Sequence, residues 1–149
     1  MPAELALVVP FPGLVELVGI PNDLPPHVTV LYPCPDSIEA IGEVVAPFDA
    51  FEVTFPRLDR FPGTLWLAPE PVEPFRRMTE AMVARFPDHA PYGGAFDSIV
   101  PHLTVAQERL DETEAQLTPL LPVGSRAESV VLYERAGGER WREAHTFTL

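Results

Sequence analysis

A short motif that occurs twice constrains the fold of this chain more than any other feature. Residues 25–33 read PPHVTVLYP and residues 100–107 read VPHLTVAQ, so Pro-His-x-Thr-Val recurs after 75 residues. Side chains alternate across a strand, so the histidine and threonine of each copy share one face, while the apolar residues face the other way. Each copy therefore predicts a strand with a core side and a polar side that presents an imidazole and a hydroxyl.

The repeat extends beyond the motif. Nine residues after each histidine stands an aspartate before a predicted helix, and 39 residues after each stands one of the two tryptophans, Trp66 and Trp141. Each histidine is followed by a predicted strand, helix, strand and strand. We therefore expect an α+β fold with two pseudo-symmetric lobes from an internal duplication. Antiparallel-rich sheets flanked by helices would enclose a central cleft, within one domain over residues 1–149.

Periodicity and turn residues predict the individual elements. The predicted strands cover 4–9, 27–32, 50–58, 64–69, 102–107, 127–133 and 140–149. The predicted helices cover 36–48, 73–86 and 111–121, and the second has an apolar face made by Phe75, Met78, Met82 and Phe86. Residues 87–100 are predicted to form a loop punctuated by glycine and proline.

The net charge of the chain limits the kinds of ligand that it can bind. Ten arginines, no lysine and 22 acidic residues give a formal net charge of −12, and no basic stripe is visible. The mean field would repel long duplex nucleic acid, whereas a small phosphate-bearing ligand can bind a local pocket. No apolar run is long enough to span a membrane, and Cys34 is alone, which suits a reducing compartment. We expect a cytoplasmic monomer that does not bind membranes.

The paired motifs suit phosphodiester chemistry. In-line displacement at phosphorus needs a base at the attacking oxygen and an acid at the leaving oxygen. His27 and His102 can each serve in either role near neutral pH. The hydroxyls of Thr29 and Thr104 can donate hydrogen bonds to the non-bridging oxygens. This set of residues requires no metal ion and no other cofactor.

At these residues the chain resembles the 2H phosphoesterases, which include the bacterial 2′-5′ RNA ligase-like proteins and cyclic nucleotide phosphodiesterases. HVTV and HLTV match both copies of the family's His-x-(Thr/Ser)-hydrophobic motif. The resemblance implies a duplicated two-lobed α+β fold. It also implies metal-independent action on 2′,3′-cyclic phosphates, 2′-5′ linkages or RNA ends, with His27, His102, Thr29 and Thr104 as the catalytic set. The implied partner is a small cyclic nucleotide or a short RNA end.

Three further residues are candidates for substrate binding. Members of this family often carry an aromatic residue near the end of the first strand, where this chain has Phe11. Tyr32 follows the first motif and Arg109 follows the second. Each also has a structural interpretation: the two aromatic residues as core or rim residues, and the arginine as part of the turn before a helix.

Two other classes of function remain open at this point. The histidines could bind a metal, although each motif supplies only one imidazole and zinc would need a carboxylate from elsewhere. Alternatively, the four side chains could belong to a non-catalytic module that binds a nucleotide or another phosphorylated small molecule, because binding and turnover use the same groups.

Overall fold

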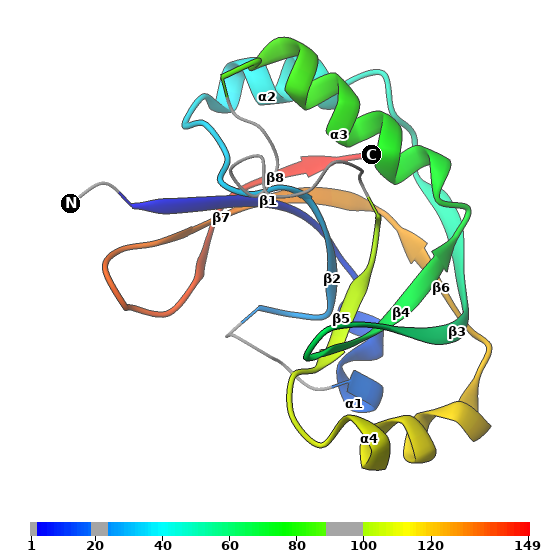
Figure 1. The fold of residues 1–149 in the computed structure, drawn as a ribbon. Helices are drawn as coiled ribbons and strands as arrows, with labels where there is room; N and C mark the ends of the chain where they lie inside the picture. The colour runs from blue at the N-terminus through cyan, green and yellow to red at the C-terminus, as the bar shows by residue number, and fades with distance from the viewer. Residues whose placement is uncertain (1–2, 19–23, 89–99) are drawn as a thin grey trace.

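The computed structural model describes residues 3–18, 24–88 and 100–149. The described residues form one eight-stranded antiparallel sheet in the order β6-β3-β4-β5-β2-β1-β7-β8, which curls strongly (Figure 1). The strands are β1 Glu4–Pro10, β2 His27–Leu31, β3 Phe51–Phe61, β4 Thr64–Glu70, β5 Leu103–Ala106, β6 Val123–Ala127, β7 Ser129–Arg135 and β8 Arg142–Thr148. The α-helices are α1 Val15–Val18, α2 Ile38–Val45, α3 Glu73–Arg85 and α4 Leu110–Leu117, with 3₁₀ turns at Pro12–Leu14 and Thr118–Leu120.

The two motif strands, β2 and β5, lie side by side at the centre of the sheet. Four strands on one side of this boundary (β5, β4, β3 and β6) mirror four on the other (β2, β1, β7 and β8). Helices α2 and α3 pack together, α3 contacts β2, and α4 contacts β4 at the opposite end of the molecule (Figure 1). The predicted α+β fold with two pseudo-symmetric lobes is thereby confirmed.

The lobes do not coincide with the two halves of the sequence. Strands β3 to β6 come from one continuous segment, whereas the other lobe combines the N-terminal β1 and β2 with the C-terminal β7 and β8. The two tryptophans consequently occupy different places. Trp66 lies in β4 and is buried, whereas Trp141 precedes the edge strand β8 and is only half-buried.

The third strand of the chain is longer than its sequence predicts. The proline and glycine in the segment 59–63 indicated a loop, but β3 continues to Phe61 and turns at Pro62-Gly63 into β4. Gly63 has a φ of +76°, which a residue with a Cβ rarely adopts. Strand β6 was not predicted, because its sequence VGSRA lacks a clear apolar alternation; it pairs with β3 at the sheet edge.

The core lies under the apolar faces of the strands and the inner face of α3. Phe75, Met78 and Met82 are buried as the periodicity predicted, and Phe86 is half-buried. The buried Thr79 donates its hydroxyl proton to the carbonyl of Val30 at 2.7 Å, so α3 is tied to β2 without an unpaired polar group. This tie fixes the strand that carries the first motif.

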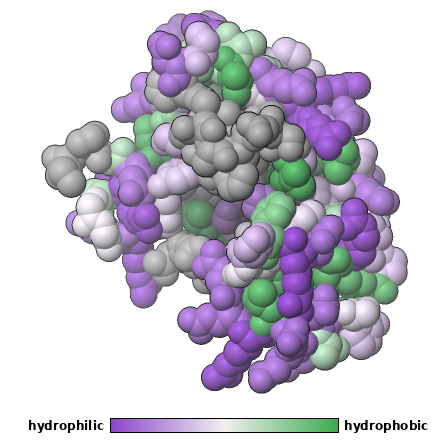
Figure 2. Space-filling view, viewed as in Figure 1, coloured by the Kyte–Doolittle hydropathy of each residue, from purple (hydrophilic) through white to green (hydrophobic). Residues whose placement is uncertain are grey.

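The face of the molecule in Figure 2 is mostly hydrophilic, with hydrophobic side chains in small separate groups. Among the described residues, the exposed large hydrophobic side chains are Ile38, Val100 and Leu120. No helix of the described part of the chain is long and apolar enough to cross a membrane. Most of the loop predicted over 87–100 lies outside the described residues.

Candidate functional site

The site is built from the two central strands. In β2, Val28 and Val30 are buried while His27 and Thr29 are half-buried, and β5 repeats the pattern around the buried Leu103. The predicted alternation is therefore confirmed in both copies. The apolar residues enter the core, which leaves the histidines and threonines on the opposite face of the sheet.

The pairing of β2 with β5 brings the two motifs together. Val28 lies opposite Leu103 in antiparallel register. Continuing this register by one residue on either side places each histidine opposite the threonine of the other motif. His27 and His102 are then diagonal neighbours, about 7–8 Å apart in strand geometry, with a pseudo-twofold axis through the Val28–Leu103 pair. A phosphate group between the two imidazoles would be flanked on opposite sides.

Both imidazoles are held in the same way. Nδ1 of His27 donates a hydrogen bond to the carbonyl of Pro25 at 2.8 Å, and Nδ1 of His102 donates to the carbonyl of Val100 at 2.8 Å. A carbonyl only accepts, so each Nδ1 carries the proton and each neutral ring leaves Nε2 with a free lone pair. The proline before each histidine restricts the backbone that presents this carbonyl. The duplicated Pro-His therefore sets the tautomer as well as the direction of each ring.

The two threonine hydroxyls are available. Among the described residues, neither Thr29 nor Thr104 makes a side-chain hydrogen bond. On the side away from the other motif, their neighbours are Val8 and Trp66, whose side chains offer these hydroxyls no acceptor. A hydroxyl that is half-buried and unpaired can donate to a phosphate oxygen without first breaking another contact.

Burial sets the protonation state of the pair. Desolvation lowers the pKa of His27 from 6.5, and the positive charge of His102 lowers it further, against the opposing effect of the Pro25 carbonyl. Desolvation also lowers the pKa of His102 from 6.5, against the effect of the Val100 carbonyl. The electrostatic influence of one imidazole on the other agrees with their proximity in the sheet register. Both rings are consequently neutral bases in the unliganded protein at pH 7.

Two aromatic rings form a wall beside His102. The ring of Phe61 lies 5.0 Å from the imidazole in an edge-to-face arrangement, and the ring of Trp66 lies 5.8 Å away. Phe61 and Trp66 also pack on each other at 4.8 Å. Phe61 was not predicted as a site residue, because a phenylalanine at a hairpin tip has no signal that links it to a histidine 41 residues later.

A β-bulge brings one arginine to the same face. Thr54 pairs with Glu70 but Arg57 pairs with Ala68, so β3 has one extra residue at Phe55-Pro56. The bulge reverses the alternation, and Arg57 turns to the face of the histidines instead of the core. Extending the β4–β5 register places Ala68 beside His102. Arg57 therefore lies in the row of His102, about 10 Å away across two strand spacings, with only the small Ala68 between them.

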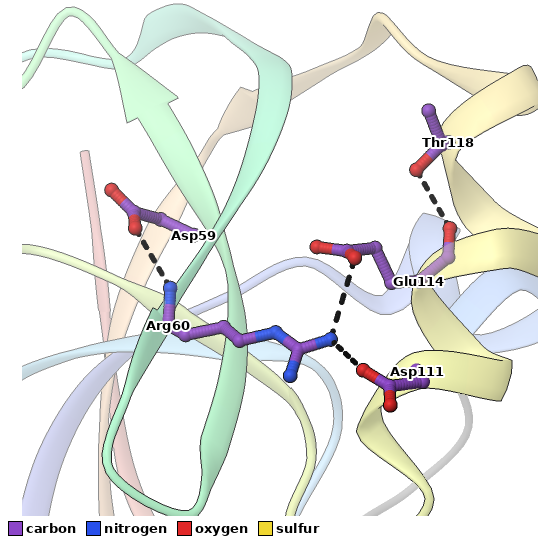
Figure 3. Close-up of polar contacts among 5 residues, drawn as sticks. All are labelled: Asp59, Arg60, Asp111, Glu114 and Thr118. Carbon is purple, nitrogen blue, oxygen red and sulfur yellow. Dashed lines mark hydrogen bonds and ion pairs between the residues drawn. The ribbon is translucent and has the colours of Figure 1, made fainter.

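The hairpin that carries Phe61 is tied to α4. Nη2 of Arg60 lies 2.7 Å from Oδ1 of Asp111 and 3.3 Å from Oε2 of Glu114 (Figure 3). The backbone N–H of Arg60 donates to Asp59 Oδ1 at 2.8 Å. These ion pairs are exposed, and they link the hairpin beside His102 to α4.

The structure does not bring Phe11 to the site. Its ring has no exposed surface and packs on Phe55 at 5.3 Å and Phe75 at 6.4 Å, so it cannot stack on a substrate. Its backbone N–H donates to the carbonyl of Pro26 at 2.6 Å. Phe11 thus supports the start of the motif strand from the core, which corrects its assignment as a binding residue.

Tyr32 and Arg109 also lie away from the two histidines. Tyr32 is five residues along the chain from His27, about 16 Å in an extended strand, and its ring contacts that of Trp141 at 6.3 Å. Arg109 is exposed at the start of α4, past the far end of β5, with a left-handed backbone at φ 51°. The geometry gives neither residue a contact with a phosphate held between the histidines.

The described residues contain no group of three or more His, Cys, Asp and Glu side chains placed to hold a metal ion. Cys34 is buried, and burial together with the nearby Asp36 raises the pKa of its thiol to about 12. Such a thiol is almost entirely protonated at neutral pH, and a protonated thiol is a poor nucleophile.

Two His-x-Thr strands paired about a pseudo-twofold axis, inside a two-lobed antiparallel α+β fold, define the 2H phosphoesterase class. The model of the 2′-5′ RNA ligase superfamily matches residues 19–139, and the chain belongs to this superfamily. The resemblance seen in the motifs is thereby confirmed, and family membership supports an activity of the phosphoesterase type. No curated protein sequence matches the chain.

Several solved structures share the fold. TT0787 of Thermus thermophilus is 19% identical with a TM-score of 0.68, and the match covers 98% of this chain and 97% of that one. E. coli LigT complexed with 3′-AMP is 16% identical with a TM-score of 0.62, covering 100% and 99%. LigT complexed with NADP+ is 17% identical with a TM-score of 0.63, covering 99% and 98%. At these identities the likeness concerns the fold.

Proposed function

We propose that this protein is a metal-independent phosphodiesterase that acts on 2′,3′-cyclic phosphates, 2′-5′-linked nucleotides or RNA ends. One observation carries the proposal: an equivalent hydrogen bond of 2.8 Å holds each imidazole by its Nδ1 atom. Within the described part of the chain, both Nε2 atoms are left without a hydrogen bond on one face of the sheet. Two threonine hydroxyls, neither of which bonds to another described residue, share that face. Family membership and the two-lobed fold support the same chemistry.

The proposed reaction on a 2′,3′-cyclic phosphate uses water. One imidazole Nε2 removes a proton from water as its oxygen attacks phosphorus. The other imidazole, protonated, donates its proton to the 3′ oxygen as the bond from phosphorus to that oxygen breaks. Thr29 and Thr104 donate hydrogen bonds to the non-bridging oxygens. The product is a 2′-phosphate with a free 3′-hydroxyl.

The proposed substrates are small cyclic phosphates or short oligonucleotide ends. The net charge of −12 disfavours a long polyanion. LigT, which shares the fold, has been solved with 3′-AMP and NADP+, both of them small nucleotides. The direct test is the turnover of a nucleoside 2′,3′-cyclic phosphate by purified protein, with phosphorus-31 NMR to separate the 2′-phosphate from the 3′-phosphate. Binding without turnover would instead identify a phosphate-binding module.

We predict that hydrolysis survives chelation. The proton transfers and the phosphate contacts come from the four motif side chains, so no ion is required. The rate on a 2′,3′-cyclic phosphate would be measured with and without excess EDTA, and again after adding Mn²⁺ or Zn²⁺. Activity that EDTA abolishes and a metal restores would overturn the mechanism.

We predict that kcat/KM is highest below pH 6.5. The reaction needs one neutral and one protonated imidazole, and kcat/KM reports the pKa values of the free protein. Burial lowers both histidine pKa values from 6.5, so the protonated member is lost at a lower pH than in a free histidine. The basic limb of the bell-shaped pH–rate profile therefore shifts to lower pH. The apparent pKa values of both limbs belong to the coupled pair of histidines, not to either residue alone.

A pH–rate profile at constant ionic strength measures this optimum. The bound phosphate is an anion and stabilises an imidazolium, so the basic limb of kcat should lie at higher pH than that of kcat/KM. An optimum of kcat/KM well above pH 6.5 would contradict the proposed protonation states.

A further inference from the structure

A pocket adjoins His102 on the side away from His27. It encloses about 290 Å³, at the lower end of the range for small-molecule sites. Its wall comes from β3, β4, the start of α3 and the two residues before His102. The lining residues are Arg57, Trp66, Ala68, Pro69, Glu70, Val72, Arg76, Val100 and Pro101.

The pocket is cationic in an otherwise acidic protein. Arg57 and Arg76 contribute two positive charges, and Glu70 at the exposed end of β4 contributes one negative charge. The other lining residues are apolar. This local excess of positive charge contrasts with the net charge of −12 for the chain. We call this site the arginine pocket.

Both guanidinium groups are only weakly engaged. Arg57 lies 3.1 Å from Asp59, and Arg76 lies 3.3 Å from Glu73. All four side chains are well exposed, and exposed ion pairs of this kind contribute little to stability. A phosphate group would offer each arginine a stronger, charge-assisted partner at little cost.

The arginine pocket is continuous with the catalytic face. Val100 lines it, and the carbonyl of Val100 accepts the hydrogen bond from His102 Nδ1. Trp66 lines it and also contacts the His102 ring. Ala68, which lies between Arg57 and His102 in the strand register, also lines it. A ligand bound at the histidines can therefore extend into this pocket.

We propose that the arginine pocket binds a second phosphate group of the substrate, next to the phosphodiester on which the histidines act. This inference rests on the proposed function and deepens it. The preferred substrates are then nucleotides that carry a further phosphate, such as the end of an oligonucleotide, over nucleoside cyclic phosphates that carry only one.

Binding measurements test the proposal without turnover. Calorimetry would compare adenosine 3′-monophosphate with adenosine 3′,5′-bisphosphate, which adds one phosphate. We expect the wild type to bind the bisphosphate about tenfold more tightly or better, which is the scale of one charge-assisted hydrogen-bond pair. Arg57→Gln and Arg76→Gln should each bring this ratio close to one. Equal affinity of the wild type for both ligands would overturn the proposal.

Arg77→Gln is the matched control. Arg77 is the next residue of α3, is exposed, and does not line the pocket. The substitution removes the same charge from the same helix, so it should keep the wild-type ratio. A ratio that falls equally in Arg76→Gln and Arg77→Gln would show a general charge effect and would contradict a specific pocket.

A kinetic experiment distinguishes a failure of the pocket proposal from a failure of the proposed function. For each enzyme, kcat/KM for adenosine 2′,3′-cyclic phosphate that carries a 5′-phosphate is divided by kcat/KM for the same compound without it. This ratio should be about tenfold lower in Arg57→Gln than in the wild type. If no cyclic phosphate turns over but the bisphosphate still binds more tightly, the pocket stands and the hydrolase proposal fails. If both cyclic phosphates turn over equally well and bind equally well, the hydrolase stands and the pocket proposal fails.

Discussion

His27→Ala and His102→Ala should each lower kcat/KM on a 2′,3′-cyclic phosphate by about 10²–10⁴-fold, the usual contribution of one general acid or base. That loss corresponds to about 2.7–5.4 kcal/mol of transition-state stabilisation. The double variant should lose less than the product of the two factors, because the two imidazoles act as a unit on one phosphate. Initial rates with saturating and subsaturating substrate give both kinetic parameters.

The chain offers a matched control for these variants. His145 lies in HTFT near the C-terminus, which mimics the motif, but it is exposed on the edge strand β8. His145→Ala should therefore retain wild-type activity. Thr29→Val and Thr104→Val should lower the maximal rate and keep the shape of the pH profile, because the hydroxyls orient the phosphate and transfer no proton. Near wild-type kcat/KM in either motif-histidine variant would remove that residue from the mechanism.

Phe11→Ala should lower the free energy of unfolding by about 3–5 kcal/mol, the usual cost of removing a fully buried phenylalanine side chain. The ring has no exposed surface and packs against Phe55 and Phe75. Truncation leaves a cavity between β3 and α3. Urea unfolding curves measure the loss, and the milder Phe11→Leu variant provides protein for kinetics if the alanine variant does not fold.

Phe61→Ala is the comparison for Phe11→Ala. Phe61 is half-buried and stands beside the His102 ring, so its removal should cost less stability and more activity. The expected pattern is an unchanged KM for Phe11→Leu and a lower kcat/KM for Phe61→Ala. A Phe11→Leu enzyme with normal stability and a raised KM would restore Phe11 as a residue that contacts substrate.

Local patterns predicted most elements of the fold. A continuous apolar run identified β1 as a strand buried on both faces, and alternation identified β2, which is buried on one face. The 3.6-residue period identified the buried face of α3. Strand β6 was missed because it is an edge strand whose stability comes from its pairing with β3. The sequence repeat also could not show that one lobe combines the two ends of the chain, since pairing between distant strands leaves no local signal.

The four motif residues and the residues around them differ in how far they could be predicted. The four motif residues followed from the repeat alone. Arg57 did not, because simple alternation along β3 assigns it to the core side. Pro56 was the available signal, because proline is tolerated in a strand mainly at edges and bulges. After a bulge, each later side chain points to the opposite side of the sheet from the one that simple alternation predicts. Phe61 had no comparable signal.

The sequence by itself determined the chemistry that this protein can offer. Two histidines, two threonines and the prolines before the histidines specify strand faces and ring tautomers, because these depend on bonds and contacts only two residues apart. Tertiary structure alone decided which side chains surround that chemistry. It placed Phe61 and Trp66 beside His102, turned Arg57 to the same face of the sheet, and buried Phe11 in the core. Those neighbours depend on strand register, a bulge and packing between distant segments, which are set by the free energy of the whole fold.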